Sequence, residues 1–96
     1  MTITVLATFH VKAEKTDTFL AACRELIEHT MHDQGVESYQ LQRNSDNPNH
    51  FVFVERWASK ADLDLHLNTA HIAKAFPILV ECCETEPQVQ IFTPAF

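Results

Sequence analysis

Hydrophobic and polar residues follow two different periods along this 96-residue chain. Residues 2–12 alternate, with every second side chain apolar, which predicts a β-strand. The next segment carries apolar residues at steps of three and four, which predicts a helix with one apolar face; they are Phe19, Leu20, Cys23, Leu26, Ile27 and Met31. We expect Thr16 to cap this helix, and Gly35, the only glycine, to adopt a positive φ where the chain leaves it.

A β-hairpin is predicted for residues 36–57. The alternating segments VESYQLQR and HFVFVERW flank NSDNPN, which is rich in turn-forming residues. In the second segment one face carries Phe51, Phe53, Glu55 and Trp57, and the other carries Val52, Val54 and Arg56. Apolar side chains on both faces indicate that neither face of this strand is exposed to solvent in the assembled protein.

The last part of the chain predicts a helical region followed by a strand. Ser59 with Asp62 resembles a capping box that starts a helix, Thr69 can cap its continuation, and PQVQIFTPAF alternates again. The order strand, helix, strand, strand, helix, strand predicts one α+β domain over residues 1–96. The expected architecture is a ferredoxin-like βαββαβ fold, an antiparallel sheet with the helices on one face. We expect the opposite face, with Val52 and Val54, to be buried against a second copy in a homodimer.

Charge and composition argue against several classes of protein. The net charge is −6, and no basic run occurs, which argues against nucleic-acid binding. No apolar run approaches the roughly 20 residues that span a bilayer, and MTITVLATFHV lacks the charged segment of a signal peptide. The chain has three cysteines, an odd number, and two of them are adjacent and rarely pair, which favours reduced thiols over disulfides. We therefore expect a cytoplasmic protein without a membrane partner.

Two histidines are the main candidates for chemistry. His66 lies on the apolar face of the second helical region with Leu63 and Leu67, and His71 lies beside the apolar stripe that includes Phe76. Core packing, an acid–base role and a metal site are the three interpretations. A spacing of five separates two side chains by about 140° around a helix, and no carboxylate or cysteine completes a familiar ligand set, so we expect no metal. With one glycine the chain cannot build a phosphate or dinucleotide loop, and we expect no cofactor.

Glu55 and Trp57 share a strand face with Phe51 and Phe53. If that face meets the helices, an aromatic wall stands opposite His66; the alternative is an ordinary aromatic core. A carboxylate there needs a partner such as an arginine or a histidine, because burying it unpaired is costly. An acid–base pair in an aromatic cavity is a familiar arrangement with perturbed pKa values, as found in active sites.

The segment FVFVERWASKADLDLHLNTAHIAKAF resembles the antibiotic biosynthesis monooxygenase family, in which a strand ending in E-x-W is followed by H-x-x-[ST]-x-H and a helix. VKAEKTDTFLAACREL and GVESYQLQRNSDNPNHF are similar to the family's first helix and hairpin, so the resemblance covers essentially the whole chain. It implies a dimeric α+β barrel with a pocket between sheet and helices in each subunit. It also implies oxidation of a small aromatic or quinol-like substrate by O₂, without metal or flavin.

The same resemblance suggests roles for individual residues. Trp57 is expected to line the pocket as a stacking wall, with His66 as the catalytic base and His71 close by, since the ordinary pKa of histidine lies near neutrality. Tyr39 and Glu55 are expected to orient the substrate. The complete set of expected substrate contacts is Tyr39, Phe53, Glu55 and Phe76.

Three alternatives to this function make different demands on the pocket. The haem-degrading branch of the family fits poorly, because its haem histidine would fall at Phe76 and its pocket asparagine near Ala7 or Thr8. An isomerase of a small phosphorylated metabolite would need cations in the pocket, and Arg43 and Arg56 are the only arginines near the sheet. A non-catalytic dimer that binds a small ligand needs the same cavity as an oxygenase, so the sequence does not separate these two.

Overall fold

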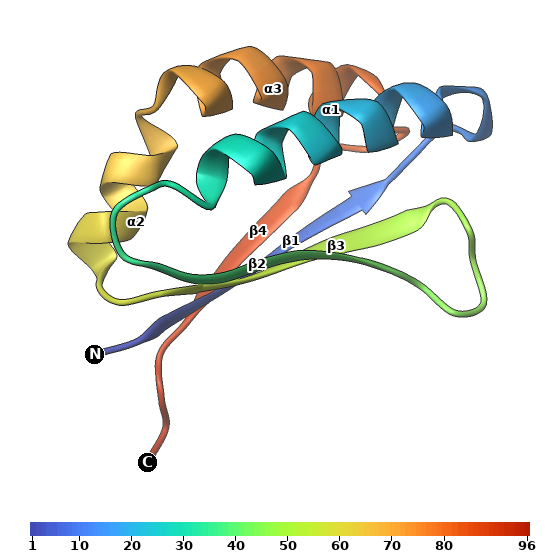
Figure 1. Ribbon diagram of the computed structural model, residues 1–96. Coiled ribbons are helices and arrows are strands. Elements are labelled where there is room, and N and C mark those ends of the chain that lie inside the picture. Colours follow the sequence, from blue (N-terminus) through green and yellow to red (C-terminus); the bar gives the residue numbers. More distant parts are fainter.

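The computed structural model describes residues 1–96 as a four-stranded sheet with three α-helices on one face (Figure 1). The elements are β1 (Ile3–His10), a 3₁₀ turn (Ala13–Lys15), α1 (Thr16–Thr30), β2 (Val36–Arg43), β3 (His50–Trp57), α2 (Lys60–Leu67), α3 (Ala70–Glu81) and β4 (Gln88–Phe92). The strand order is β2-β3-β1-β4, and every neighbouring pair is antiparallel. The predicted ferredoxin-like α+β fold is confirmed, with the second helical region divided into α2 and α3.

The inner face of the sheet is the one covered by the helices. The alternation in β1 and β3 buries Ile3, Val5, Ala7, Phe9, Phe51, Phe53, Glu55 and Trp57. The register places Ala7 opposite Phe53 and Val5 opposite Glu55, so that one carboxyl group lies among apolar side chains. On the outer face, Val52 and Val54 are half-buried in the single chain.

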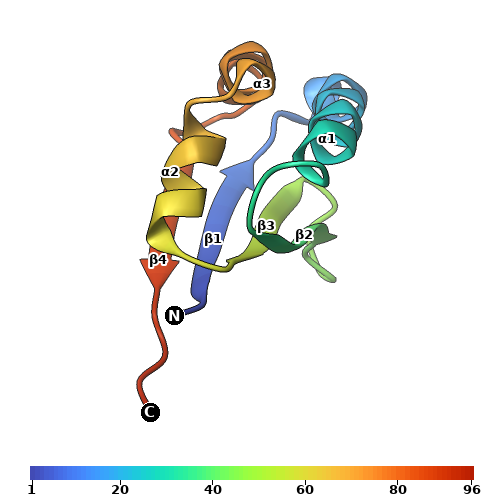
Figure 2. The same ribbon diagram turned by 60° about the vertical axis from the view of Figure 1, so that its left-hand side comes forward.

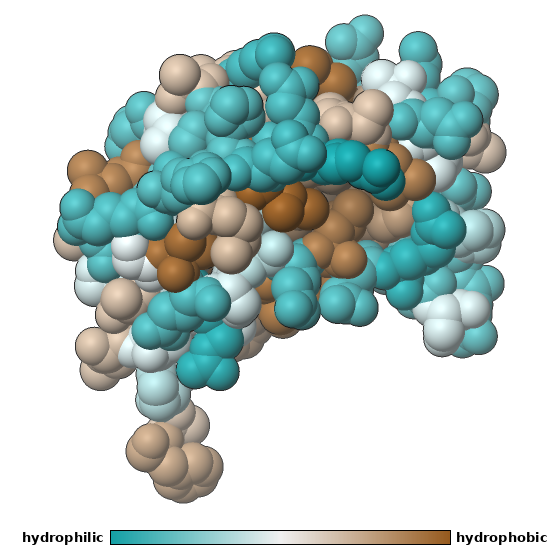
Figure 3. All heavy atoms as spheres, in the orientation of Figure 1, coloured by the Kyte–Doolittle hydropathy of each residue, from teal (hydrophilic) through white to brown (hydrophobic).

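The helices form one layer above the sheet. α1 and α3 run side by side, and α2 lies at one end of the layer (Figures 1 and 2). The outer surface of α1 is hydrophilic, and apolar atoms show in the seam beneath it (Figure 3), where Leu20, Ile27 and Leu41 line a shallow depression. None of the helices is both long and apolar enough to cross a membrane.

Both predicted caps of the second helical region are confirmed. The Ser59 hydroxyl accepts a hydrogen bond from the backbone N–H of Asp62 at 3.1 Å, at the start of α2. The Thr69 hydroxyl accepts one from the backbone N–H of Ile72 at 3.3 Å, at the start of α3. Two separate N-terminal caps make two separate helices, because each cap satisfies backbone donors that have no partner within the helix.

The cap predicted at Thr16 is wrong. The 3₁₀ turn before α1 has already started the helical path, and the backbone N–H of Thr16 bonds to the carbonyl of Ala13. The Thr16 hydroxyl instead donates to Oδ1 of Asn49 at 2.8 Å and ties the start of α1 to the β2–β3 hairpin.

The prediction for Gly35 is confirmed, since its φ is 80°. A Cβ at this position would collide with the side chain of Asp62. The neighbouring Gln34 donates from Nε2 to Oδ1 of Asp62 at 2.9 Å. The loop after α1 is therefore fixed against the start of α2, and this contact holds Asp33 beside the junction of α2 and α3.

Candidate active site

A cavity of about 370 Å³ lies between the inner face of the sheet and the helices. Thirteen of its fifteen lining residues are hydrophobic, and the other two are Glu55 on β3 and His66 on α2. Phe76, Val89 and Ile91 are partly exposed where they line it. The volume is in the lower part of the range usual for ligand pockets, so the cavity suits one small apolar ligand.

Glu55 forms part of the cavity floor and is only 5% exposed. Its Oε1 accepts a hydrogen bond from the indole Nε1–H of Trp57 at 3.0 Å. Burial raises the pKa of Glu55 to about 7, and the hydrogen bond from Trp57 opposes that rise. The expectation that an arginine or a histidine would be its partner is therefore wrong. Near neutral pH this carboxyl group can either donate or accept a proton.

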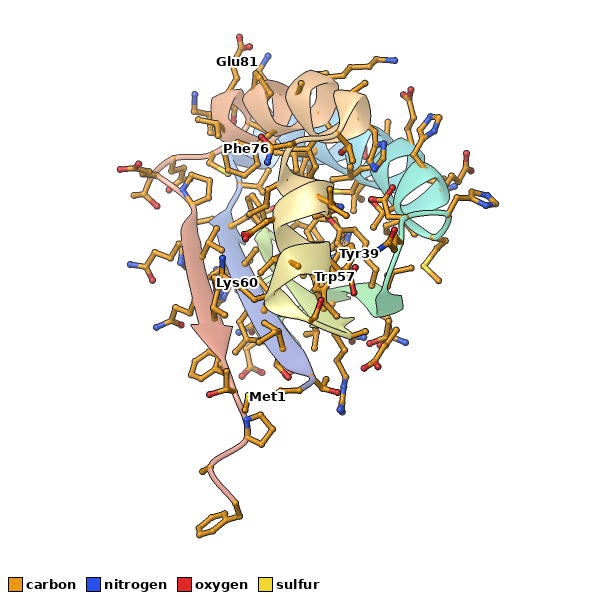
Figure 4. The ribbon with its side chains drawn as sticks, turned by 90° about the vertical axis from the view of Figure 1, so that its left-hand side faces the viewer. Met1, Tyr39, Trp57, Lys60, Phe76 and Glu81 are labelled. Atoms are coloured by element: carbon orange, nitrogen blue, oxygen red, sulfur yellow. The ribbon has the colours of Figure 1, made fainter.

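Trp57 is fully buried and is not among the residues that line the cavity. Its ring centroid lies 4.5 Å from that of His66 and 6.2 Å from that of Tyr39. Figure 4 shows Trp57 and Tyr39 behind α2. The structure thus places Trp57 where it supports Glu55 and His66 rather than where it touches a ligand.

His66 reaches the cavity from α2, and its side chain is 1% exposed. Its Nδ1 lies 2.8 Å from Oδ2 of Asp33. Burial lowers the pKa of His66; the hydrogen bond and negative charge of Asp33 raise it, and His71 lowers it. Because an ionised carboxylate only accepts hydrogen bonds, Nδ1 is the protonated nitrogen of the neutral ring. Nε2 then carries the lone pair, and it makes no hydrogen bond within the chain.

His71 lies outside the cavity but is bound to the same carboxylate. Its Nε2 is 2.7 Å from Oδ2 of Asp33, and its ring lines a groove between α1 and α3. Two side chains five residues apart point about 140° apart only when both belong to one continuous helix. Because the chain instead starts a new helix after Thr69, both histidines reach one oxygen atom.

Asp33 is the residue that sequence reasoning missed. It lies in a loop outside every periodic segment, and it is 33 residues from His66 and 38 from His71 along the chain. The only local signal was Gly35, which marks the turn that carries Asp33. The sequence offered no carboxylate at a familiar ligand spacing from the two histidines, and the tertiary structure brings Asp33 to both of them.

These three residues also form the one group with the composition of a metal site, since their nearest ligand atoms lie within 4.8 Å of one another. In a tetrahedral zinc site, bonds of about 2.0–2.1 Å hold ligand atoms more than about 3 Å apart. The distances of 2.7 and 2.8 Å from Asp33 to the two histidines are shorter. The geometry is therefore that of two hydrogen bonds to a shared acceptor.

Five of the seven residues expected at the site line the cavity: Tyr39, Phe53, Glu55, His66 and Phe76. Burial raises the pKa of Tyr39 well above its usual value, so its hydroxyl stays protonated. Its ring lies 4.9 Å from that of Phe53. Phe76 projects from α3 near β4 (Figure 4) and is 37% exposed.

No lysine or arginine lines the cavity. The guanidinium of Arg43 lies over the ring of Phe51, at 5.0 Å from its centroid, and Arg56 is exposed on the outer face of the sheet. A phosphorylated ligand would therefore meet no fixed positive charge in this cavity.

Comparisons with known proteins agree with the fold. The family described as "Antibiotic biosynthesis monooxygenase" matches residues 2–77. The Bacillus subtilis (strain 168) protein named "Putative monooxygenase YcnE" is 33% identical over 69 residues, which cover 72% of this chain and 73% of that protein.

Two solved structures are similar over nearly their whole length. The crystal structure of a conserved protein from Methanosarcina mazei Go1 has a TM-score of 0.94 and 33% identity, covering 96% of this chain and 91% of that one. A crystal structure described as an antibiotic biosynthesis monooxygenase has a TM-score of 0.92 and 30% identity, covering 97% and 98%.

Proposed function

This chain belongs to the antibiotic biosynthesis monooxygenase family, and we propose that it oxidises a small aromatic, quinol-like substrate with O₂ in the cavity between sheet and helices, without metal or flavin. One observation carries the proposal. His66 has one nitrogen held by Asp33 and the other available to a ligand, in a cavity whose other walls are almost entirely apolar.

His66 is the proposed base. Since burial lowers its pKa, its ring is uncharged near neutral pH and ready to accept a proton. The hydrogen bond from Nδ1 to Asp33 fixes the ring and leaves the lone pair on Nε2. When Nε2 takes the hydroxyl proton of the substrate, the carboxylate of Asp33 stabilises the imidazolium that forms.

The oxidation itself needs little from the protein. The phenolate passes an electron to O₂, and the radical pair recombines to a peroxide on a ring carbon. Loss of water from this peroxide gives the oxygenated product. For a hydroquinone, one oxygen atom enters the ring as a hydroxyquinone and the other leaves as water. The substrate supplies all the electrons, so no separate reductant is consumed. The apolar walls keep water away from the reactive intermediates.

Glu55 and Tyr39 are the proposed orienting groups. One oxygen of Glu55 is occupied by Trp57, which leaves the other for the second hydroxyl of a quinol. With a pKa of about 7, Glu55 can hold that hydroxyl in either protonation state. Tyr39 remains a neutral hydrogen-bond donor. In this scheme Trp57 and His71 act through Glu55 and Asp33 rather than by touching the substrate.

We also propose that two copies pack through the outer face of the sheet. Leu6, Val52 and Val54 are half-buried there, and Phe92 is 45% exposed. No helix of the chain covers this face (Figure 1). A second sheet packed against it would remove these apolar side chains from water, which favours association.

Oxygen uptake tests the proposed function. The purified protein is incubated in air with a panel of hydroquinones and naphthols, with and without EDTA. We expect turnover of at least one compound, no effect of EDTA, and one atom from ¹⁸O₂ in the product. Trp57 is the only tryptophan, so its fluorescence reports ligand binding next to the cavity. A compound that changes this fluorescence but never consumes O₂ would make the protein a ligand-binding protein instead.

A further inference from the structure

Asp33 links a residue of the cavity to a residue of a separate surface groove. Its Oδ2 accepts hydrogen bonds from His66 at 2.8 Å and from His71 at 2.7 Å. The His66 side chain is 1% exposed and lines the cavity, whereas the His71 side chain is 17% exposed and lines the groove between α1 and α3. One carboxylate oxygen therefore joins an inner and an outer imidazole.

A single carboxylate neutralises only one imidazolium. The rings of His66 and His71 have centroids 6.0 Å apart, so two positive charges would repel each other strongly in this partly buried place. A proton added to one ring therefore makes a proton on the other ring less stable. The more exposed His71 ring loses less hydration on charging than the His66 ring does, so the outer position is the less costly one for a positive charge.

We propose that Asp33 and His71 form a proton-exchange relay for His66: when His66 takes up a proton from a ligand in the cavity, His71 releases one to water in the groove between α1 and α3. The Nε2–H bond of His66 forms and the Nδ1–H bond of His71 breaks. Both hydrogen bonds to Asp33 remain, and the net charge of the three groups does not change. The reverse exchange returns a proton to the cavity. The catalytic use of the relay rests on the proposed function, but the coupling itself is a property of the resting protein.

Other titratable groups lie near the relay on α1, α3, β2 and β3. On α1, His29 stacks against His71 with ring centroids 5.7 Å apart, and Glu25 pairs with Lys74 of α3 at 2.7 Å. The ring centroid of Tyr39 on β2 lies 5.3 Å from that of His66, and the Tyr39 hydroxyl stays protonated. Glu55 on β3 is the one further acid in the cavity. Glu55→Gln therefore serves as the background in which the coupling is measured without a second titration.

Histidine ring nitrogens observed by ¹⁵N NMR across a pH series, with EDTA present, test the relay. His71→Gln keeps an N–H donor for Asp33 but removes the competing charge. We expect the pH at which His66 gains its proton to rise by about one unit or more in this variant, and to fall in Asp33→Asn. His29→Gln is the matched control beside His71 and should leave the His66 titration unchanged. In the Glu55→Gln background, an identical His66 titration with and without His71→Gln would overturn the proposal, even if Asp33→Asn does not fold.

The relay and the proposed function fail in different ways. If no quinol is oxidised but His71→Gln shifts the His66 titration, the relay stands and the oxygenase activity is wrong. If O₂ is consumed and the His66 titration does not change in His71→Gln, the oxygenase stands and the relay is wrong. Where both hold, His71→Gln should lower kcat several-fold and leave KM almost unchanged, because His71 does not touch the substrate.

Discussion

Replacing Glu55 by glutamine should remove a pH-dependent loss of stability. The glutamate is 5% exposed, and burial raises its pKa from 4.5 to about 7 in the folded protein. Between these two values the folded state binds more protons than the unfolded state. The free energy of unfolding therefore falls as the pH rises through this window, and the loss is complete above the folded pKa. Glutamine has the same shape and can accept the same hydrogen bond from Trp57, but it carries no charge at any pH.

The expected size of the effect follows from the shift itself. One pKa unit corresponds to about 1.4 kcal/mol, so the rise from 4.5 to about 7 amounts to about 3 kcal/mol at high pH. Glu55→Gln should therefore gain about 3 kcal/mol relative to the parent protein between about pH 4.5 and about pH 8. A fixed cost from burying the amide group would shift both values equally and cancel in this comparison.

Urea unfolding of both proteins at these two pH values, at one protein concentration, measures the difference. Keeping the concentration fixed matters because association would change the apparent stability. Glu37→Gln, which alters an exposed glutamate on β2, is the control and should show no such gain. The reasoning is refuted if the stability difference between Glu55→Gln and the parent protein is the same at both pH values.

Three further predictions concern the base, the metal content and the dimer. His66→Ala should reduce turnover of a quinol by about 10²- to 10⁴-fold while costing about 1–3 kcal/mol of stability. His71→Ala should lose less activity and less stability. Full activity of His66→Ala with a lower melting temperature would make His66 a core histidine. Elemental analysis should find no stoichiometric zinc, iron or copper, and one metal per chain would reverse our interpretation of the Asp33 cluster. Light scattering should give about twice the chain mass of 11.0 kDa, and Val54→Glu should give a monomer; a monodisperse monomer of the parent protein at micromolar concentration would refute the face-to-face packing.

Local patterns in the sequence were enough to determine the elements and their order. The period of two in residues 2–12 and the steps of three and four after Thr16 depend only on which residues share a face of a strand or a helix. The caps at Ser59 and Thr69 and the positive φ of Gly35 are likewise decided within a few residues. These features were predictable because backbone geometry and neighbouring side chains settle them.

Two local features of the structure differ from the expectation. The partner of Glu55 is Trp57, two positions along the same strand. Alternate strand residues share a face, so this pair is predictable from the sequence; the partner that satisfies Glu55 is a neutral N–H donor and not a positive charge. At Thr16 the capping rule was overridden, because a 3₁₀ turn had already begun at Ala13 and Asn49 of the hairpin offered the hydroxyl another partner.

The centre of the candidate site was decided only by the tertiary structure. Asp33 belongs to no periodic pattern, and its distance along the chain from both histidines gives no reason to pair them. The contact of the loop with Asp62 and the break between α2 and α3 together bring three side chains to one point. The sequence alone determined which faces are apolar and hence that His66 points inward. Which carboxylate meets it depended on how separate elements pack, because that contact joins residues whose local conformations do not constrain one another.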